Sequence, residues 1–189
     1  VTVIYPVRGR KDTGDMTPNG MYPYVNGLPF LQEVATATNS PVMALLMHWE
    51  GTAPWAPPYV FPPFGGVEVF ADFLRQAHER NMLVGLYMSG MGYTLKSNVL
   101  LDYDCTADFE RDCIADIVCA DSDGSKRGII CPQQRIGYDL CPACEQTKQI
   151  MSDEITKLCD MGVDYVQALD QNHGGVNYFC YSDKHGHVP

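Results

Sequence analysis

Short apolar runs alternate with amphipathic helical stretches along most of this chain, and this alternation constrains its fold more than any other feature. Apolar runs typical of β-strands occupy residues 41–48, 82–88, 134–140 and 163–170. Residues 67–80 and 143–161 repeat apolar side chains at the spacing of a helix face, and residues 109–118 do so more weakly. Strands that alternate with helices form parallel sheets through right-handed crossovers. The sequence therefore predicts an α/β protein.

Polar and aromatic clusters follow each of these strands, at residues 48–50, 87–93, 138–141 and 170–175. The loops after the strands of a TIM (β/α)8 barrel meet at one rim, which carries the active site. Such a barrel has eight strands and about 250 residues. We therefore expect residues 41–189 to form roughly the N-terminal half of a TIM barrel, as a fragment of a longer protein. Residues 1–40 are expected to form a lead-in strand and loops.

The acidic composition excludes some partners. The formal net charge is -10, with 13 Lys+Arg against 23 Asp+Glu. Binding to phosphates or to anionic lipids needs a basic face, so neither a nucleic acid nor a membrane is an expected partner. No apolar run approaches the ~20 residues of a membrane span. The sequence indicates no compartment.

Eight cysteines raise the question of metal binding or disulfides. Cys141 and Cys144 have the spacing of zinc ligands, but a zinc ribbon needs a second close cysteine pair, which this sequence lacks. Cys113 and Cys159 fall on apolar helical faces, where a free cysteine behaves as a small hydrophobic residue. Buried thiols are the expectation, with one local pair, and a disulfide framework remains an alternative.

Two other patterns suggest metal ions. His185 and His187 are a close pair, but loop histidines more often face solvent or accept hydrogen bonds. The acidic run at residues 121–125 lacks the further carboxylates of a calcium loop, so it predicts a hairpin turn. Neither a metal nor another cofactor is expected.

Several motifs together resemble a known family. These are His-Trp-Glu-Gly-Thr-Ala-Pro-Trp at 48–55, Leu-Cys-Pro at 140–142, and residues 162–171 and 180–187. They are similar to bacterial glycoside-hydrolase-like barrels catalogued as a domain of unknown function, from about residue 41 to the C-terminus. More distantly, Gly-Val-Asp-Tyr-Val before a strand-end Asp resembles the α-galactosidase clan, whose nucleophile ends the fourth barrel strand. That resemblance implies Asp170 as the nucleophile. This chain has one extra residue between Asp164 and Asp170, which requires a bulge or a shifted strand end.

Strand alternation makes a separate prediction about faces. Residues 166, 168 and 170 share one face, which we expect to line the barrel interior, and residues 165, 167 and 169 are expected to face the helices. A retaining glycosidase needs a second carboxyl about 5 Å from the nucleophile. Glu50 and Asp139 are the other strand-end carboxylates. Glu50 is expected to bind a sugar hydroxyl or to hold its loop, and Asp139 to bind substrate or to stabilise its turn. The resemblance places the acid/base on a later strand, beyond residue 189.

The sequence thus predicts a retaining O-glycoside hydrolase that acts on a glycan, with Asp170 as its catalytic nucleophile. A non-catalytic carbohydrate-binding or structural barrel is the alternative, and a metal-dependent hydrolase ranks third. Aromatic rings stack on sugars. The expected substrate-binding residues are Trp49, Glu50, Trp55, Tyr87, Asp139, Gln171 and His173. We expect the remainder of the barrel, or a second copy, to cover the open sheet edge, and the 189-residue chain alone to be inactive.

Overall fold

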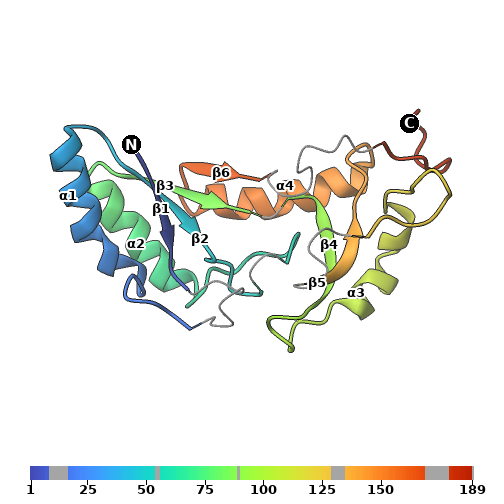
Figure 1. Ribbon diagram of the computed structural model, residues 1–189, viewed down its shortest axis with the longest axis horizontal. Coiled ribbons are helices and arrows are strands. Elements are labelled where there is room, and N and C mark those ends of the chain that lie inside the picture. Colours follow the sequence, from blue (N-terminus) through green and yellow to red (C-terminus); the bar gives the residue numbers. More distant parts are fainter. Residues whose placement is uncertain (9–16, 54–55, 89, 129–134, 169–178, 189) are drawn as a thin grey trace. The chain divides into compact units, whose positions relative to one another are not determined.

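The computed structural model describes residues 1–8, 17–53, 56–88, 90–128, 135–168 and 179–188. The chain forms two compact units (Figure 1). Unit 1 comprises Val1–Pro54, Phe61–Tyr87 and Thr156–Gln167, and unit 2 comprises Trp55–Val60, Met88–Ile155 and Ala168–Pro189. Within the described ranges, no helix has the length and apolar character needed to cross a membrane.

Unit 1 contains a four-stranded parallel sheet. Its strands are β1 (Thr2–Pro6), β2 (Met43–Met47), β3 (Leu83–Tyr87) and β6 (Tyr165–Gln167), and they lie side by side in that order. The parallel sheet predicted from the sequence is confirmed for β2, β3 and β6. Over the described residues the sheet ends at β1 and β6 and does not close into a barrel.

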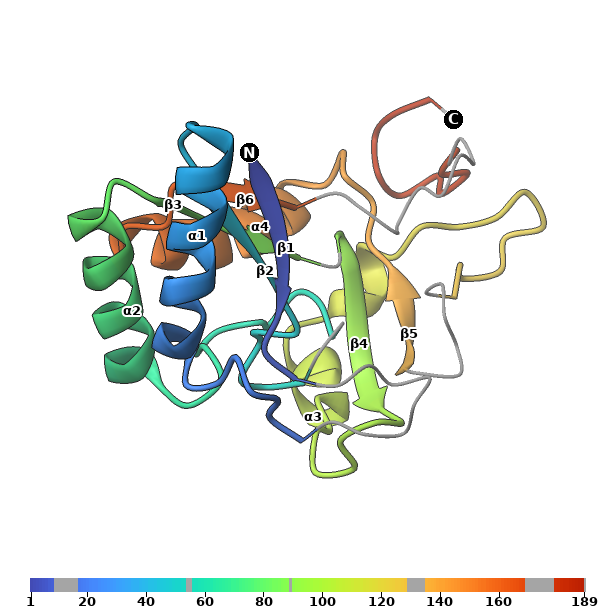
Figure 2. The same ribbon diagram turned by 60° about the vertical axis from the view of Figure 1, so that its left-hand side comes forward.

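Two α-helices pack on one side of this sheet (Figure 2). A short 3-10 helix, η2 (Tyr24–Gly27), leads into α1 (Leu28–Thr38), and α2 (Val67–Glu79) connects β2 to β3. Phe70, Phe73, Leu74 and Ala77 of α2 are buried, as the helical spacing predicted. The ring of Phe73 stacks on Tyr5 of β1. Residues 1–40 therefore supply a sheet strand and a helix, where the sequence suggested only a lead-in strand and loops.

Strand register shows which residues face the helices. Tyr5 pairs with Leu46, Leu46 with Leu86, and Leu86 with Val166, so these four side chains lie on the side of α2. Tyr165 and Gln167 lie on the opposite side, in line with Gly85 and Tyr87. The predicted assignment of β6 faces was therefore reversed. Alternation alone defines two faces, and only the pairing register shows which of them meets the helices.

Unit 2 contains a separate two-stranded antiparallel sheet, formed by β4 (Gly92–Ser97) and β5 (Arg135–Asp139). The prediction that residues 134–140 form a strand of the parallel sheet was wrong. A Cβ on Gly137 would lie 2.1 Å from the carbonyl oxygen of Tyr93, so the close approach of β4 requires glycine there. A strand as short as β5 does not indicate from its sequence whether its partner strand runs parallel or antiparallel to it.

Unit 2 also contains two short helices, α3 (Thr106–Arg111) and η3 (Ile114–Asp116). The helix α4 (Glu145–Asp160) begins in unit 2 and continues into unit 1. A buried cluster of Tyr93, Ile114, Ile117, Val118 and Leu140 forms the core. The predicted hairpin turn at 121–125 is confirmed, because Ala120 bridges Lys126 and the amide of residue 121 donates to the carbonyl of residue 125.

Two predicted buried thiols are exposed. Cys113 adopts a left-handed conformation (φ 52°) between α3 and η3, so the expected helix at 109–118 is interrupted there. Cys159 lies outside the buried row of α4, which runs through Thr147, Met151, Glu154 and Leu158. The predicted C-terminus of α4 is confirmed, and Gly162 follows it with φ 93°.

Candidate functional site

Five buried side chains gather where β1, β2 and β3 end, and we call them the strand-end cluster: Arg8, His48, Trp49, Glu50 and Tyr87. They belong to unit 1. β2 ends at Met47, and His48 then takes a left-handed conformation (φ 58°) that turns the chain into the following loop. The imidazole Nδ1 of His48 lies 3.2 Å from the carbonyl oxygen of Arg8, across the gap between the ends of β1 and β2.

Trp49 is a core side chain. It is fully buried, its indole N–H donates to the carbonyl oxygen of Tyr87 at 2.8 Å, and its ring stacks on Phe70 of α2. Tyr87, the last residue of β3, is also buried and shares the side of the sheet that Gln167 occupies. The proximity of Trp49 and Tyr87 at the strand ends agrees with the expected rim, while their contact with sugar stays a prediction.

Glu50 is fully buried beside Arg8. The Arg8 guanidinium donates from Nε to the carbonyl of His48 at 3.0 Å and from a terminal nitrogen to the carbonyl of Glu50, and it lies 4.1 Å from the centre of the Phe64 ring. Burial lowers the pKa of Arg8, and the negative charge of Glu50 opposes that shift. Arg8 was not among the residues singled out in the sequence, because it belongs to no recognised motif.

The loop after Glu50 is held by backbone hydrogen bonds. Gly51 donates to the carbonyl of Pro62 at 2.8 Å, and Phe64 donates to the carbonyl of Trp49 at 2.6 Å. The backbone of Glu50 also forms an antiparallel β-bridge with the backbone of Pro63. These backbone bonds hold the loop, while the role of the Glu50 side chain, in sugar binding or in loop holding, stays a prediction.

Asp164, in the stretch Gly-Val-Asp-Tyr-Val at residues 162–166, makes structural contacts. One of its carboxylate oxygens accepts the backbone N–H of Val84 at 2.8 Å and lies 2.8 Å from Nε2 of His78. It therefore joins the starts of β3 and β6 to the end of α2, at the opposite end of the sheet from the strand-end cluster.

Asp139 ends β5 in unit 2 and is buried. Burial raises the pKa of this carboxyl to about 6, against the lowering effect of Arg127 and Arg135. Among the described residues, neither of its oxygens accepts a hydrogen bond. Asp139 ends a strand of the antiparallel sheet, so the prediction that it ends a strand of the parallel sheet was wrong. The remaining predicted site residues, namely Trp55, Asp170, Gln171 and His173, lie outside the described residues.

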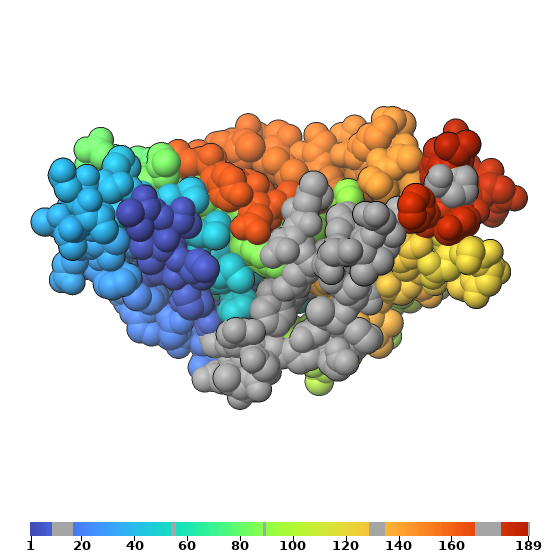
Figure 3. All heavy atoms as spheres, turned by 45° about the horizontal axis from the view of Figure 1, so that its top comes forward, coloured from blue at the N-terminus to red at the C-terminus, as the bar shows by residue number. Residues whose placement is uncertain are grey.

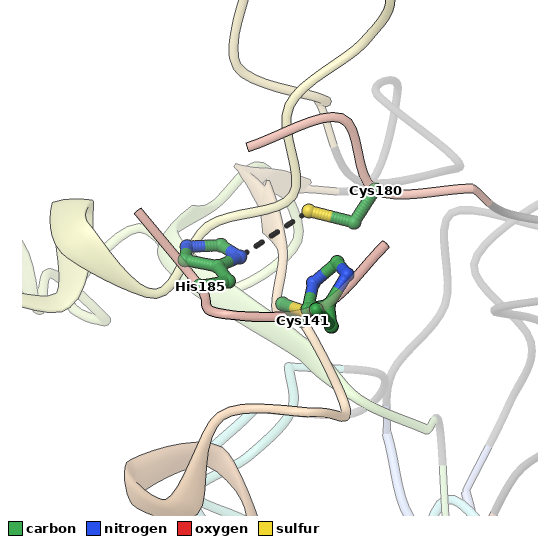
Figure 4. Close-up of side chains that lie close together, drawn as sticks. Cys141, Cys180 and His185 are labelled. Carbon is green, nitrogen blue, oxygen red and sulfur yellow. Dashed lines mark hydrogen bonds between the residues drawn. The ribbon is translucent and has the colours of Figure 1, made fainter. Parts of the chain in front are cut away.

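A second cluster, which sequence reasoning did not assemble, lies in unit 2, and we call it the Cys-His cluster: Cys141, Cys180, His185 and His187. Figure 4 shows Cys141 after β5, with Cys180 and His185 from the C-terminal segment beside it. Cys180 Sγ lies 3.3 Å from Nδ1 of His185, the contact that Figure 4 marks with a dashed line. The close spacing of 180, 185 and 187 was the available signal.

The C-terminal segment also borders a hollow. Figure 3 shows the C-terminal segment (red) beside the turn after residue 119 (yellow). The backbone amide of Tyr181 donates there to the carbonyl of Ala120. A cavity of about 510 Å³ lies between these segments, and Asp116, Asp121, Asp123 and Asp183 are among its lining residues. This acidic hollow adjoins the Cys-His cluster through His185.

Comparisons with known proteins place the fold. No family model matches the chain, and no curated protein matches its sequence. The ligand-free α-N-acetylgalactosaminidase NagBb from Bifidobacterium bifidum has a similar structure, with a TM-score of 0.61, 11% identity and 87% of this chain covered. The isomaltulose synthase of Erwinia rhapontici NX5 matches with a TM-score of 0.53, 15% identity and 87% coverage. The α-amylase of H. orenii matches with a TM-score of 0.52, 14% identity and 86% coverage.

The matches cover 27%, 34% and 38% of those three chains, so this chain spans a minor part of each neighbour. At identities this low, the likeness concerns the fold alone. The chain has a mixed α/β architecture with a parallel sheet, and its fold is similar to part of these neighbours, which are TIM-barrel glycoside hydrolases.

Proposed function

We propose that this chain is the N-terminal part of a retaining O-glycoside hydrolase that acts on a glycan, with Asp170 as the nucleophile. The order of the parallel sheet carries the proposal. β6 is its fourth strand, and Asp170 follows the end of β6 closely in the sequence. The sequence counted residues 134–140 among the first four strands and left out β1. In the structure β1 belongs to the parallel sheet and β5 does not. β6 is therefore still the fourth strand, and the α-galactosidase clan carries its nucleophile at the end of that strand.

The proposed chemistry has two steps. The Asp170 carboxylate attacks the anomeric carbon, the glycosidic bond breaks, and a general acid protonates the departing oxygen. The residue that acted as the general acid then deprotonates a water molecule, which hydrolyses the covalent glycosyl-enzyme. We assign the acid/base to a later strand of the whole protein. Tyr87, Trp55, Gln171 and His173 are proposed to contact the sugar.

The test uses the full-length protein that contains this chain. Asp170→Asn is expected to abolish hydrolysis of activated aryl glycosides, and Asp170→Gly with added azide is expected to release a glycosyl azide. Asp160→Asn, on the exposed surface of α4, is the matched control and should keep wild-type turnover. Unchanged turnover in Asp170→Asn would remove this residue from the mechanism.

A non-catalytic carbohydrate-binding or structural barrel is the second candidate. The full burial of the Trp49 and Glu50 side chains, and the bond from Trp49 to Tyr87, favour it, because buried side chains serve the packing of the unit. Calorimetric binding of a sugar by a full-length protein that hydrolyses none of a broad glycoside panel would support this candidate against the first.

The isolated 189-residue chain is proposed to be inactive and to associate with itself. Over the described residues the sheet has edges at β1 and β6, and Ile4 and Tyr165 expose apolar surface on these strands. In the whole protein, later strands would cover such an edge and supply the general acid, which contributes about 10²–10⁴-fold. Light scattering with an aryl-glycoside assay checks this. A monomeric chain with glycosidase activity would contradict it.

A further inference from the structure

The ligand atoms of the Cys-His cluster are already grouped on the scale of a metal site. The two sulfur and two nitrogen atoms all lie within 4.8 Å of one another. Cys141 Sγ is 3.2 Å from His187 Nε2, and Cys180 Sγ is 3.3 Å from His185 Nδ1. In tetrahedral zinc sites, Zn–S bonds of about 2.3 Å and Zn–N bonds of about 2.0–2.1 Å put neighbouring ligand atoms about 3.3–3.8 Å apart. The grouping therefore matches a tetrahedral site with small adjustments.

Both imidazoles are oriented by their other nitrogen. His185 Nε2 lies 2.8 Å from the carbonyl oxygen of Asp116, and His187 Nδ1 lies 3.0 Å from the carbonyl oxygen of Val188. A carbonyl can only accept, so the nitrogen that faces it carries the proton. The lone pairs of His185 Nδ1 and His187 Nε2 then point into the cluster. Metal-binding histidines use this same arrangement, in which the distal N–H donates to a carbonyl or carboxylate.

Burial also holds the two sulfur ligands in place. Both cysteines are buried, whereas the two histidines are partly exposed. Each sulfur lies against one imidazole nitrogen before any cation is bound.

We propose that Cys141, Cys180, His185 and His187 bind one Zn²⁺. Two soft thiolates and two imidazoles in a tetrahedral arrangement select zinc among common divalent ions. Four protein ligands close the coordination shell, so the site is structural and leaves no position for a catalytic water. The sequence argued against zinc because a second close cysteine pair is absent, and against a histidine site because loop histidines more often face solvent or accept hydrogen bonds.

The proposed ion fastens the C-terminal segment of unit 2. It links residues 180–187 to the turn after β5, and His185 extends the link to η3 through the carbonyl of Asp116. Because the unfolded chain lacks this preformed site, the free energy of zinc binding adds to the stability of the folded unit. The inference does not depend on the proposed glycosidase function, since metal content is measured without any activity.

The test is metal analysis of the full 189-residue chain, purified under reducing conditions and dialysed after incubation with Zn²⁺. We expect one zinc per chain in the wild type. His187→Ala, His185→Ala and Cys180→Ser are expected to fall to background. The exposed thiols Cys113 and Cys159 provide controls, and Cys113→Ser and Cys159→Ser should keep one zinc.

A spectroscopic measurement on the wild type removes the risk that a variant simply misfolds. Co²⁺ in place of Zn²⁺ is expected to give the intense visible bands of a tetrahedral ion and a thiolate charge-transfer band. Chelation should lower the Tm, and Zn²⁺ should restore it. Absence of bound metal in the reduced wild type, or a disulfide between Cys141 and Cys180 in the protein as isolated, would overturn the proposal. Zinc lost in Cys144→Ser but kept in His187→Ala would overturn this ligand set.

Discussion

The indole N–H of Trp49 reaches across from the end of β2 to the carbonyl oxygen of Tyr87 at the end of β3, at 2.8 Å. Both residues are buried. The bond therefore satisfies a main-chain acceptor that water does not reach, and it fixes the spacing of two strand ends that the proposed rim depends on.

Trp49→Phe should destabilise the protein by about 1–3 kcal/mol, because it leaves the buried carbonyl of Tyr87 without this donor. Urea unfolding followed by circular dichroism measures the change. Phe30→Leu, at a half-exposed position on α1, is the control and should shift the free energy of unfolding by less than about 0.5 kcal/mol. Equal effects of the two substitutions would show that the indole bond contributes nothing.

Arg8→Met should cost more, about 3–5 kcal/mol, because it strips Glu50 of a neighbouring positive charge and two carbonyls of their donor. The double variant Arg8→Met with Glu50→Gln should recover part of that loss, since the buried negative charge disappears as well. A double-mutant cycle in urea measures the coupling. The exposed Arg75→Met serves as the control, with an expected change below about 0.5 kcal/mol. Strict additivity of the two substitutions would contradict the pairing.

Asp164→Ala should destabilise unit 1 by about 1–3 kcal/mol, because the buried amide of Val84 loses its acceptor. Asp164→Asn keeps one acceptor oxygen and should cost less. Asp160→Ala, on α4, provides the comparison. Thermal unfolding monitors all three, and a ranking in which Asn is worse than Ala would count against the proposed bond to Val84.

Tyr5 should make the protein sensitive to alkali. Burial raises the pKa of its hydroxyl to about 12, and the hydroxyl donates to the carbonyl of Tyr24 at 2.8 Å. In the unfolded chain a tyrosine ionises near pH 10. From about pH 10 to 12 the unfolded state thus loses its proton first, and stability falls as the pH rises. Below pH 10 this contribution is constant.

Tyr5→Phe is therefore expected to lower stability at neutral pH by about 1 kcal/mol, through the lost hydrogen bond, and to flatten the decline above pH 10. Urea titrations at several alkaline pH values test both effects. Parallel stability curves for the variant and the wild type would rule out Tyr5 as a source of the alkaline decline.

Elements whose signal is local were predictable. The buried row Phe70, Phe73, Leu74 and Ala77 defines α2 by its spacing, and Gly162 marks the end of α4. Strand partners were not predictable in the same way. Residues 135–139 have the composition of a sheet strand, yet they pair antiparallel with β4, because the direction of pairing depends on contacts with residues distant in the sequence.

The candidate sites divide in the same manner. Trp49, Glu50 and Tyr87 were predictable because each stands beside the end of an apolar run. Arg8 was not, because its contacts are with the carbonyls of His48 and Glu50, which are distant from it in the sequence. The Cys-His cluster was missed because Cys141 and the histidines become neighbours only after folding.

β3 and β6 are adjacent in the sheet, but most of unit 2 lies between them in the chain. Pairing them requires closure of a long loop, whose entropic cost rises by only about 0.6 kcal/mol for each doubling of its length. If unit 2 becomes compact first, the loop between β3 and β6 is shorter in effect, and the two strands pair sooner. Long-range parallel pairing of this kind is slow to form. The pairing of β6 with β3 is thus expected to limit the refolding rate. The rate of this step should depend on how early unit 2 becomes compact.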